Sequence, residues 1–446
     1  MKSEAAPPPT RVEVPGAAGV PGAAPTAADR LGQDHPTAER GSLLTPNFLL
    51  VMAGYLSAML AHGMALWSIA SFVVHLGFDA VLGGLGLGGI AFTALAARRV
   101  VGRAVDRAGS RRPAYIGTAV MCLASAAYVA SAQVGPGSLL ALALLGAAVM
   151  THGAGFAAMG TASFSFIGEA APPGRRGEAI GYYSAFQPIV QGLAATASFA
   201  IVAAGGFSLL YAAVGASAVV STASFWMLRE PRSAASVAAG EPDGAKARGG
   251  GHYDRAVLGP VVMVGILTTA GGAATLTIPL IGLGAGISNP GVFYLASAVS
   301  GFAMRLVAGR ISDRQGRWRV AAPGLVLVSA SFGSLAVWAS LGIATFVIAG
   351  VIYGFAIAAA LPALQALVLD RGRPEHRGAN VAVMGMGQDI GYGTGSILTG
   401  VVVGAAGAGP GLVAGCLGPL VALTLLAGDT RRSSASAADL GPASPA

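Results

Sequence analysis

Three ionisable side chains lie deep inside long apolar stretches of this 446-residue chain, and they are its first candidates for chemistry. Asp389 follows Gly378 by 11 residues, which corresponds to ~16 Å of helix and to the middle of a ~30 Å hydrocarbon layer. Apolar surroundings favour the neutral form of a carboxyl group, which suits the binding and release of a proton. His62 and His152 lie at similar depth, and imidazole titrates near neutral pH.

Each of these residues also has a purely structural interpretation. Asp389 could be held by hydrogen bonds from Gln or Ser neighbours where helices pack, and a lone histidine on an apolar helix could serve only as a hydrogen-bonding residue. Three glutamines have the same two interpretations, because each could contact a polar substrate or join two helices. They are Gln187, Gln191 and Gln388.

The composition places these residues in a membrane protein. Hydrophobic residues make up 54% of the chain and charged residues 10%, whereas soluble domains carry ~25% charged residues. The net charge of +8 lies in loops and tails, so we expect no nucleic-acid partner and instead a lipid bilayer around the chain. Both cysteines, Cys122 and Cys416, lie in apolar runs, and we expect no disulfide, metal site or cofactor.

Twelve apolar runs are long enough to cross a membrane, which needs roughly 20 residues each. They cover residues 46–71, 80–101, 113–133, 138–168, 178–204, 207–228, 256–282, 291–311, 320–340, 343–369, 379–404 and 409–428. The domain organisation follows: a disordered cytoplasmic tail (1–45), a six-helix bundle (46–228), a cytoplasmic linker (229–255), a second six-helix bundle (256–428) and a cytoplasmic tail (429–446).

The positive charges give the orientation. All 27 Lys and Arg residues fall in the tails, in every second connection, or in the helix ends beside them. Positively charged loops face the cytoplasm. The sequence therefore predicts a multi-pass protein of the cell membrane with both termini in the cytoplasm.

A basic motif occurs twice at a constant offset of 207 residues. The first copy runs from Arg98 to Arg112 and the second from Arg305 to Arg319. Glu169 and Asp370, with the residues that follow them, repeat at an offset of 201. Same-sense repeats with an even number of helices are related by an axis along the membrane normal. We therefore expect an all-α fold of two six-helix halves with pseudo-twofold symmetry.

The doubled motif resembles the loop signature of the major facilitator superfamily of secondary transporters, over roughly residues 46–430. Segments such as 176–183, 291–294 and 388–395 look like bacterial exporters of the sugar-efflux and metallophore (staphylopine) type. The resemblance implies alternating access and a cavity lined by the first, fourth, seventh and tenth helices. The chain departs from the drug/proton antiporters of this superfamily at Ala147, where they carry an arginine, and at 194–199, where they carry a Gly-Pro motif.

A cytoplasmic gate is predicted at the two motif copies, where ion pairs would form in one state and break in the other. Gly102 and Gly309 would allow close helix contact. The alternative is that the arginines only set topology and bind anionic lipid, which we favour for Arg111, Arg112, Arg317 and Arg319. The gate residues are Gly102, Arg103, Asp106, Arg107, Gly109, Gly309, Arg310, Asp313, Arg314 and Gly316, with Glu169 and Asp370 as partners.

Arg98 and Arg305 lie a turn or two deeper than the loop arginines. They either extend to the lipid headgroups, which we favour, or meet an anionic substrate. The chain has no nucleotide-binding loop of the Walker type, so ATP is not expected to drive transport. We predict a monomeric, proton-coupled exporter of a small metabolite, antibiotic or metallophore. The alternatives are an importer on the same fold and a transporter-like membrane sensor or scaffold; an enzyme is not expected.

Overall fold

The structure is a computed structural model that describes residues 43–172, 175–229 and 253–439. The expected tails and linker therefore fall largely outside the described residues. Within these ranges every regular element is a helix. The α-helices are α1 (Pro46–His75), α2 (Ala80–Ala108), α3 (Arg111–Val134), α4 (Leu139–Ala170), α5 (Arg176–Trp226), α7 (Leu258–Gly284), α8 (Val292–Gln315), α9 (Arg317–Trp338), α10 (Ile343–Arg371), α11 (Arg377–Ala406) and α12 (Ala408–Asp439).

Helix α5 contains two membrane spans. Its backbone leaves helical geometry at Gly205 and at Gly206, where φ is +74°. A left-handed φ is open to glycine and costly for residues with a Cβ atom. The predicted break between the fifth and sixth spans is therefore confirmed at these two glycines.

The described helices number twelve spans once this break is counted. Ten are long and apolar enough to cross a membrane by length and composition, with Gly177–Trp226 as one of them. Its break makes eleven, and α11, which is 30 residues long but more polar, is the twelfth. Helix α12 continues to Asp439, beyond the predicted end at residue 428.

Local sequence signals set several helix ends. Thr45 accepts a hydrogen bond from the Phe48 amide before Pro46 opens α1, and Asp79 accepts one from the Val81 amide at the start of α2. Such side chains satisfy amide groups that have no partner inside the helix. Gly109 and Gly316, with φ of +74° and +93°, end α2 and α8 in a conformation that suits glycine.

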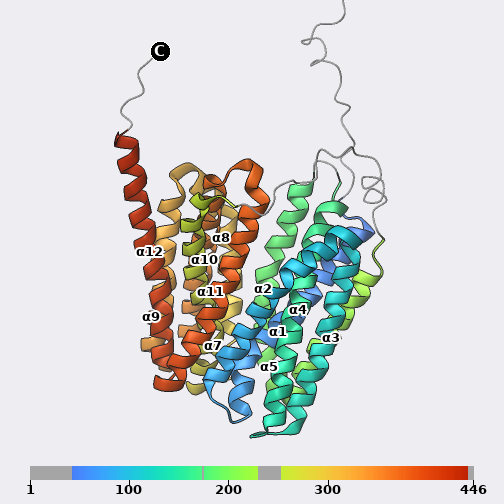
Figure 1. Cartoon of the computed structure of the whole chain (residues 1–446). Coiled ribbons are helices and arrows are strands. Elements are labelled where there is room, and N and C mark those ends of the chain that lie inside the picture. Colours follow the sequence, from blue (N-terminus) through green and yellow to red (C-terminus); the bar gives the residue numbers. More distant parts are fainter. Residues whose placement is uncertain (1–42, 173–174, 230–252, 440–446) are drawn as a thin grey trace, which may run out of the picture. The chain divides into compact units, whose positions relative to one another are not determined.

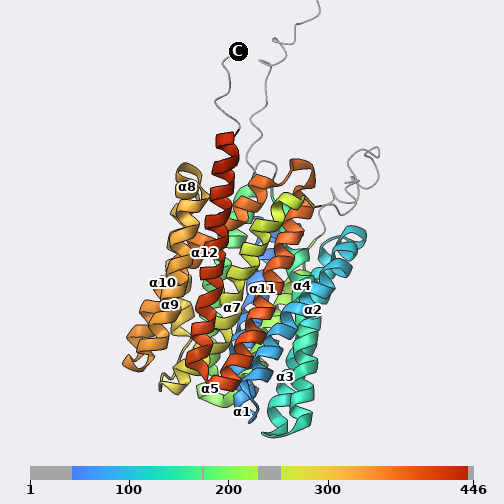
Figure 2. The same ribbon diagram turned by 60° about the vertical axis from the view of Figure 1, so that its left-hand side comes forward.

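The helices form two bundles of six, α1–α5 and α7–α12 (Figure 1). Across their interface α2 packs beside α11, α5 beside α8 and α1 beside α7 (Figure 2). In the repeat α2 corresponds to α8, and the first span of α5 corresponds to α11. The two main contacts between the halves are therefore equivalent, as the predicted pseudo-twofold symmetry requires.

The two ends of the helices differ in charge. We call the end with the α2–α3, α4–α5, α8–α9 and α10–α11 connections the basic side, and the other end the opposite side. On the basic side Ser110 contacts Glu169, and Arg317 contacts Asp370. On the opposite side the Gly137 amide donates to the Leu76 carbonyl at 2.8 Å, which joins the first two connections there.

The halves pack most closely between mid-depth and the opposite side. A Cβ atom added to Gly84 of α2 would lie 2.5 Å from the Ser396 carbonyl oxygen of α11, and one added to Gly291 would lie 2.6 Å from the Ala195 backbone. Towards the basic side, a Cβ added to Gly102 or Gly309 would meet nothing within 4 Å. The expected close contact at these two glycines is wrong for this structure, because α2 meets α11 about five helical turns away.

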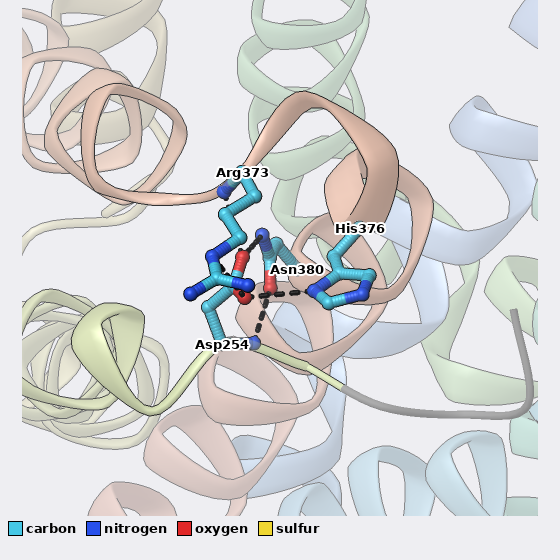
Figure 3. Close-up of polar contacts among 4 residues, drawn as sticks. All are labelled: Asp254, Arg373, His376 and Asn380. Atoms are coloured by element: carbon cyan, nitrogen blue, oxygen red, sulfur yellow. Dashed lines mark hydrogen bonds and ion pairs between the residues drawn. The ribbon is translucent and has the colours of Figure 1, made fainter.

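A polar cluster anchors the start of the second half on the basic side (Figure 3). Asp254, just before α7, accepts hydrogen bonds from the Asn380 side chain at 3.0 Å and from the Arg373 amide at 2.7 Å, and its Oδ1 lies 2.7 Å from His376 Nδ1. The Asp254 amide donates to Asn380 Oδ1 at 3.0 Å. These hydrogen bonds, those of Asn380 and His376 first, lower the pKa of Asp254 to about 2.

We predict that this cluster loosens only in acid. Because the folded pKa of Asp254 lies below its ordinary value of 3.8, the stabilisation is complete above ~4 and is lost as the pH falls towards 2. Hydrogen exchange at residues 254–257 and 376–380 should be slow and unaffected by the cluster at pH 5–7 in the native chain. The Asp254→Ala variant should exchange faster there at every pH, with Asp313→Ala as the matched control. Unchanged protection in Asp254→Ala would show that the cluster does not hold this segment.

Candidate functional site

A cavity lies between the halves and has two adjoining compartments that share Trp67, Gln191 and Tyr392. The Asp389 compartment, about 300 Å³, is lined by residues of α1, α2, α4, α5, α7 and α11. The Arg305 compartment, about 220 Å³, is lined by residues of α1, α5, α7, α8, α10 and α11. A cavity built from both halves at their interface can change its access when the halves move.

Five of the six predicted cavity residues line the Asp389 compartment. They are His62, Gln187, Gln191, Gln388 and Asp389. Residues from α1, α5 and α11, which are far apart in the chain, thus meet around one space. Their functional roles stay predictions.

Asp389 forms an ion pair with Arg98 of the other half. Arg98 Nε lies 2.6 Å from Asp389 Oδ2, and Arg98 Nη2 lies 3.2 Å from Oδ1. The two-point geometry matches the planar guanidinium to the carboxylate. The favoured expectation that Arg98 extends to the headgroups is wrong, because a carboxylate within reach neutralises the charge. Asp389 is also not held by Gln or Ser neighbours.

Depth along the helices could have revealed this pair. Arg98 lies 10 residues before the end of α2 and Asp389 lies 12 residues after the start of α11, and both ends are on the basic side. At ~1.5 Å per residue the two side chains have similar depth. The missing information was that α2 and α11 are neighbours.

The two predicted histidines form a buried pair behind the cavity wall. His62 Nδ1 lies 2.9 Å from His152 Nε2, and the His62 ring stacks on Phe156 at 3.8 Å. His62 lines the Asp389 compartment, whereas His152 is fully buried and does not line it. His152 Nδ1 has no hydrogen-bond partner among the described residues. The pair therefore joins α1 to α4, and only His62 is placed to meet a ligand.

We predict that the pair stabilises the fold as a unit. His152→Leu should lower the free energy of unfolding by about 1–3 kcal/mol, because it leaves His62 Nδ1 buried without a partner. The double variant His62→Leu/His152→Leu should be less destabilised than the sum of the singles, as measured in a double-mutant cycle of thermal unfolding. Additive effects would contradict a hydrogen bond between the rings.

The Arg305 compartment was missed by sequence reasoning. Arg305 Nη1 donates to the Ser184 carbonyl of the other half at 3.2 Å, so the expectation that Arg305 extends to the headgroups is also wrong. Aromatic side chains form the wall: Trp67 packs on Tyr294 with ring centroids 3.8 Å apart, and the Tyr392 hydroxyl lies 2.6 Å from Thr275 Oγ1. An aromatic residue in an apolar helix is ordinarily core, so no local signal marked these side chains.

The predicted gate residues make contacts within each half. Glu169 accepts hydrogen bonds from Ser110 and Ser165, both at 2.9 Å. Arg317 pairs with Asp370 at 2.9 Å and also with Asp313. Ser110 and Arg317 occupy equivalent positions of the repeat, so each half ties its basic loop to the acidic residue that ends its fourth helix.

These contacts correct part of the gate prediction. Arg317, which was assigned to topology, holds the acidic residues, whereas Arg103 donates to the Arg99 carbonyl of its own helix at 3.3 Å. Arg107, Arg310 and Arg314 are exposed. Gly109 and Gly316 act as helix ends, and the Asp106 side chain lies outside the described residues. In this structure the halves are apart at the basic side, so an ion-pair lock between them there is not formed.

The fold and the cavity define a membrane transporter built from two six-helix halves. The model of the Major Facilitator Superfamily matches residues 146–396, more than half of the chain. The chain belongs to this superfamily. No curated protein sequence matches it. Among the described residues, no group of three or more His, Cys, Asp or Glu side chains is placed to hold a metal ion.

Solved structures share the fold at low sequence identity. The xylose transporter XylE from E. coli, in a partially occluded inward open conformation, aligns with a TM-score of 0.68 and 13% identity over 86% of this chain and 99% of its own. The nucleoside transporter NupG gives 0.65 and 15% over 86% and 99%. The peptide transporter POT gives 0.66 and 13% over 86% and 94%. The fold thus serves chemically different substrates, and the substrate of this chain must be inferred from its own cavity.

Proposed function

We propose that this protein is a proton-coupled exporter of a small metabolite, antibiotic or metallophore, which works by alternating access. The observation that carries the proposal is the Arg98–Asp389 ion pair. It joins the two halves inside the cavity, and one partner can bind a proton. Protonation of Asp389 would remove one charge of the pair and with it a contact between the halves, so proton binding and movement would be linked.

The pair suits the cycle of an antiporter. With the basic side in the cytoplasm, the structure has the arrangement of an inward-facing state, since the halves pack closely towards the opposite side. Formation of the pair in this state favours ionised Asp389 and therefore release of the proton to the cytoplasm. The pair also holds the empty, deprotonated protein inward-facing, which prevents movement without substrate. Substrate binding would then drive the outward movement, and external protons would drive the return.

The proposal includes the setting of the protein. We infer a monomer in the cell membrane, with both termini and the linker in the cytoplasm, because the basic residues lie at that side. Helix α12 carries the chain out on the same side as the linker (Figure 1). A cysteine introduced into the linker should react with membrane-impermeant maleimide only after cells are opened.

Reconstitution tests coupling and direction together. Proteoliposomes with an internal pH dye should show substrate-dependent proton flux when challenged with metabolite extract from cells that produce the protein. Cells that overproduce the protein should hold less of the active metabolite, and cells without it should hold more. A higher internal level on overproduction would identify an importer, and flux that is independent of any metabolite would contradict a transporter coupled to protons.

A further inference from the structure

The cavity holds two arginines and a single carboxylate among its described residues. Arg98 is neutralised by Asp389. Arg305 donates to a neutral carbonyl, that of Ser184. The lining of the Arg305 compartment contains no acidic side chain, and Arg305 has no ion-pair partner among the described residues. A cation at this depth in a membrane protein is costly without a counter-charge, so the compartment is electrostatically incomplete.

The internal repeat shows where the missing charge belongs. Arg98 and Arg305 are equivalent at the offset of 207 residues, and each reaches across to the other half. Arg98 meets Asp389 on α11. At the offset of 201 the residue equivalent to Asp389 is Pro188 on α5, which lines the Arg305 compartment. The first half therefore has a proline where the second half has its carboxylate, and Arg305 is left with an open side.

The rest of the compartment defines the body of a ligand. Its walls include Trp67, Tyr294, Tyr353 and Ile357, with the hydroxyl groups of Thr275 and Ser297. Flat aromatic walls favour a compact apolar or aromatic group. The guanidinium fork of Arg305 matches the oxygens of a carboxylate or a phosphate, which can accept two hydrogen bonds at once.

We propose that Arg305 is the anion-binding residue of this cavity, and that its ligand carries a carboxylate or phosphate group on a compact apolar or aromatic body. The anion takes the place that a second aspartate would occupy if the halves were identical. That the ligand is the transported molecule rests on the proposed function. That it binds here does not, because binding needs only the compartment.

Ligand-induced thermal stabilisation of the purified full chain in detergent tests the binding. The probes are benzoate and phenyl phosphate, with benzamide and benzyl alcohol as neutral counterparts of similar size. At least one of the two anions should raise the unfolding temperature in a saturable way, and the neutral compounds should not. The stronger anion identifies the charged group as carboxylate or phosphate.

Three variants locate the effect. Arg305→Gln should weaken anion binding about ten- to a hundredfold, and Arg305→Lys should weaken it less because the charge remains. Pro188→Asp should abolish it by supplying the internal carboxylate. Arg319→Gln, an exposed arginine on the basic side, should bind as the native chain does. Each variant is first checked for a single species in size-exclusion chromatography.

Several results would overturn the inference: no stabilisation by either anion, equal stabilisation by the neutral compounds, or unchanged binding in both Arg305→Gln and Pro188→Asp. Failure of the proposed function has a different signature. If Asp389→Asn still transports on a pH gradient while Arg305→Gln no longer binds anions, the coupling proposal fails and the anion site remains.

Discussion

The Asp389→Asn variant is expected to lose all transport driven by a pH gradient, while the protein remains folded and inserted in the membrane. The amide cannot exchange a proton at neutral pH, and it cannot form the charge-assisted pair with Arg98. Proton flux in proteoliposomes should fall to that of empty vesicles. Substrate exchange without a gradient should persist, because the cavity keeps its shape.

A charge-neutral control separates coupling from stability. Asp389→Asn alone leaves Arg98 without its partner, and we expect a loss of about 1–2 kcal/mol in the free energy of unfolding, since Arg98 is 40% exposed and partly solvated. The double variant Arg98→Gln/Asp389→Asn should recover most of this stability and remain uncoupled. Gradient-driven flux in either variant at the native rate would exclude Asp389 as the proton-binding residue.

The Gly84→Leu variant is expected to shift the protein away from the observed state. A side chain at Gly84 would collide with the Ser396 carbonyl of α11, which lies 2.5 Å from the Cβ position. Overpacking of this kind costs about 1–3 kcal/mol, which corresponds to a change of roughly 5- to 150-fold in the ratio of two states. The halves should therefore open at the opposite side.

Labelling of a buried cysteine measures this shift. Val403 is 9% exposed and packs in a core cluster that contains residues of both halves. In a background with Cys122 and Cys416 replaced by serine, Val403→Cys should react with membrane-impermeant maleimide faster when Gly84 is leucine. Gly146→Leu is the matched control, because a Cβ at Gly146 meets nothing within 4 Å. Equal labelling rates in both variants would show that the α2–α11 contact does not control access.

Much of the fold could be predicted from residues alone because the membrane imposes strong rules. A span needs a long apolar run, and positive charges gather on one side, so the helices and the break at Gly205 and Gly206 follow from composition. The repeat of the basic motif then predicts two equivalent halves. The candidate cavity residues were accessible for the same reason, since an ionisable group such as Asp389 is rare and costly in an apolar run.

The partners of those residues could not be predicted in this way. Arg98 and Arg305 looked alike, and headgroup contact was the ordinary expectation for an arginine near a helix end. Their different fates depend on which helices of the two halves are neighbours, and on what stands at equivalent positions of α5 and α11. Likewise, Arg317 was assigned to topology until its distance to Asp370 was known.

The sequence by itself determined twelve spans, their duplication, the clustering of charge on one side and the identity of the ionisable residues within the membrane, because these follow from local composition and from the cost of burying charge. Only the tertiary structure decided that Arg98 neutralises Asp389, that His152 stands behind His62 and that Arg305 faces an aromatic compartment without a carboxylate. Contacts between halves depend on helix neighbours and side-chain directions, and a linear pattern of apolar runs does not specify them.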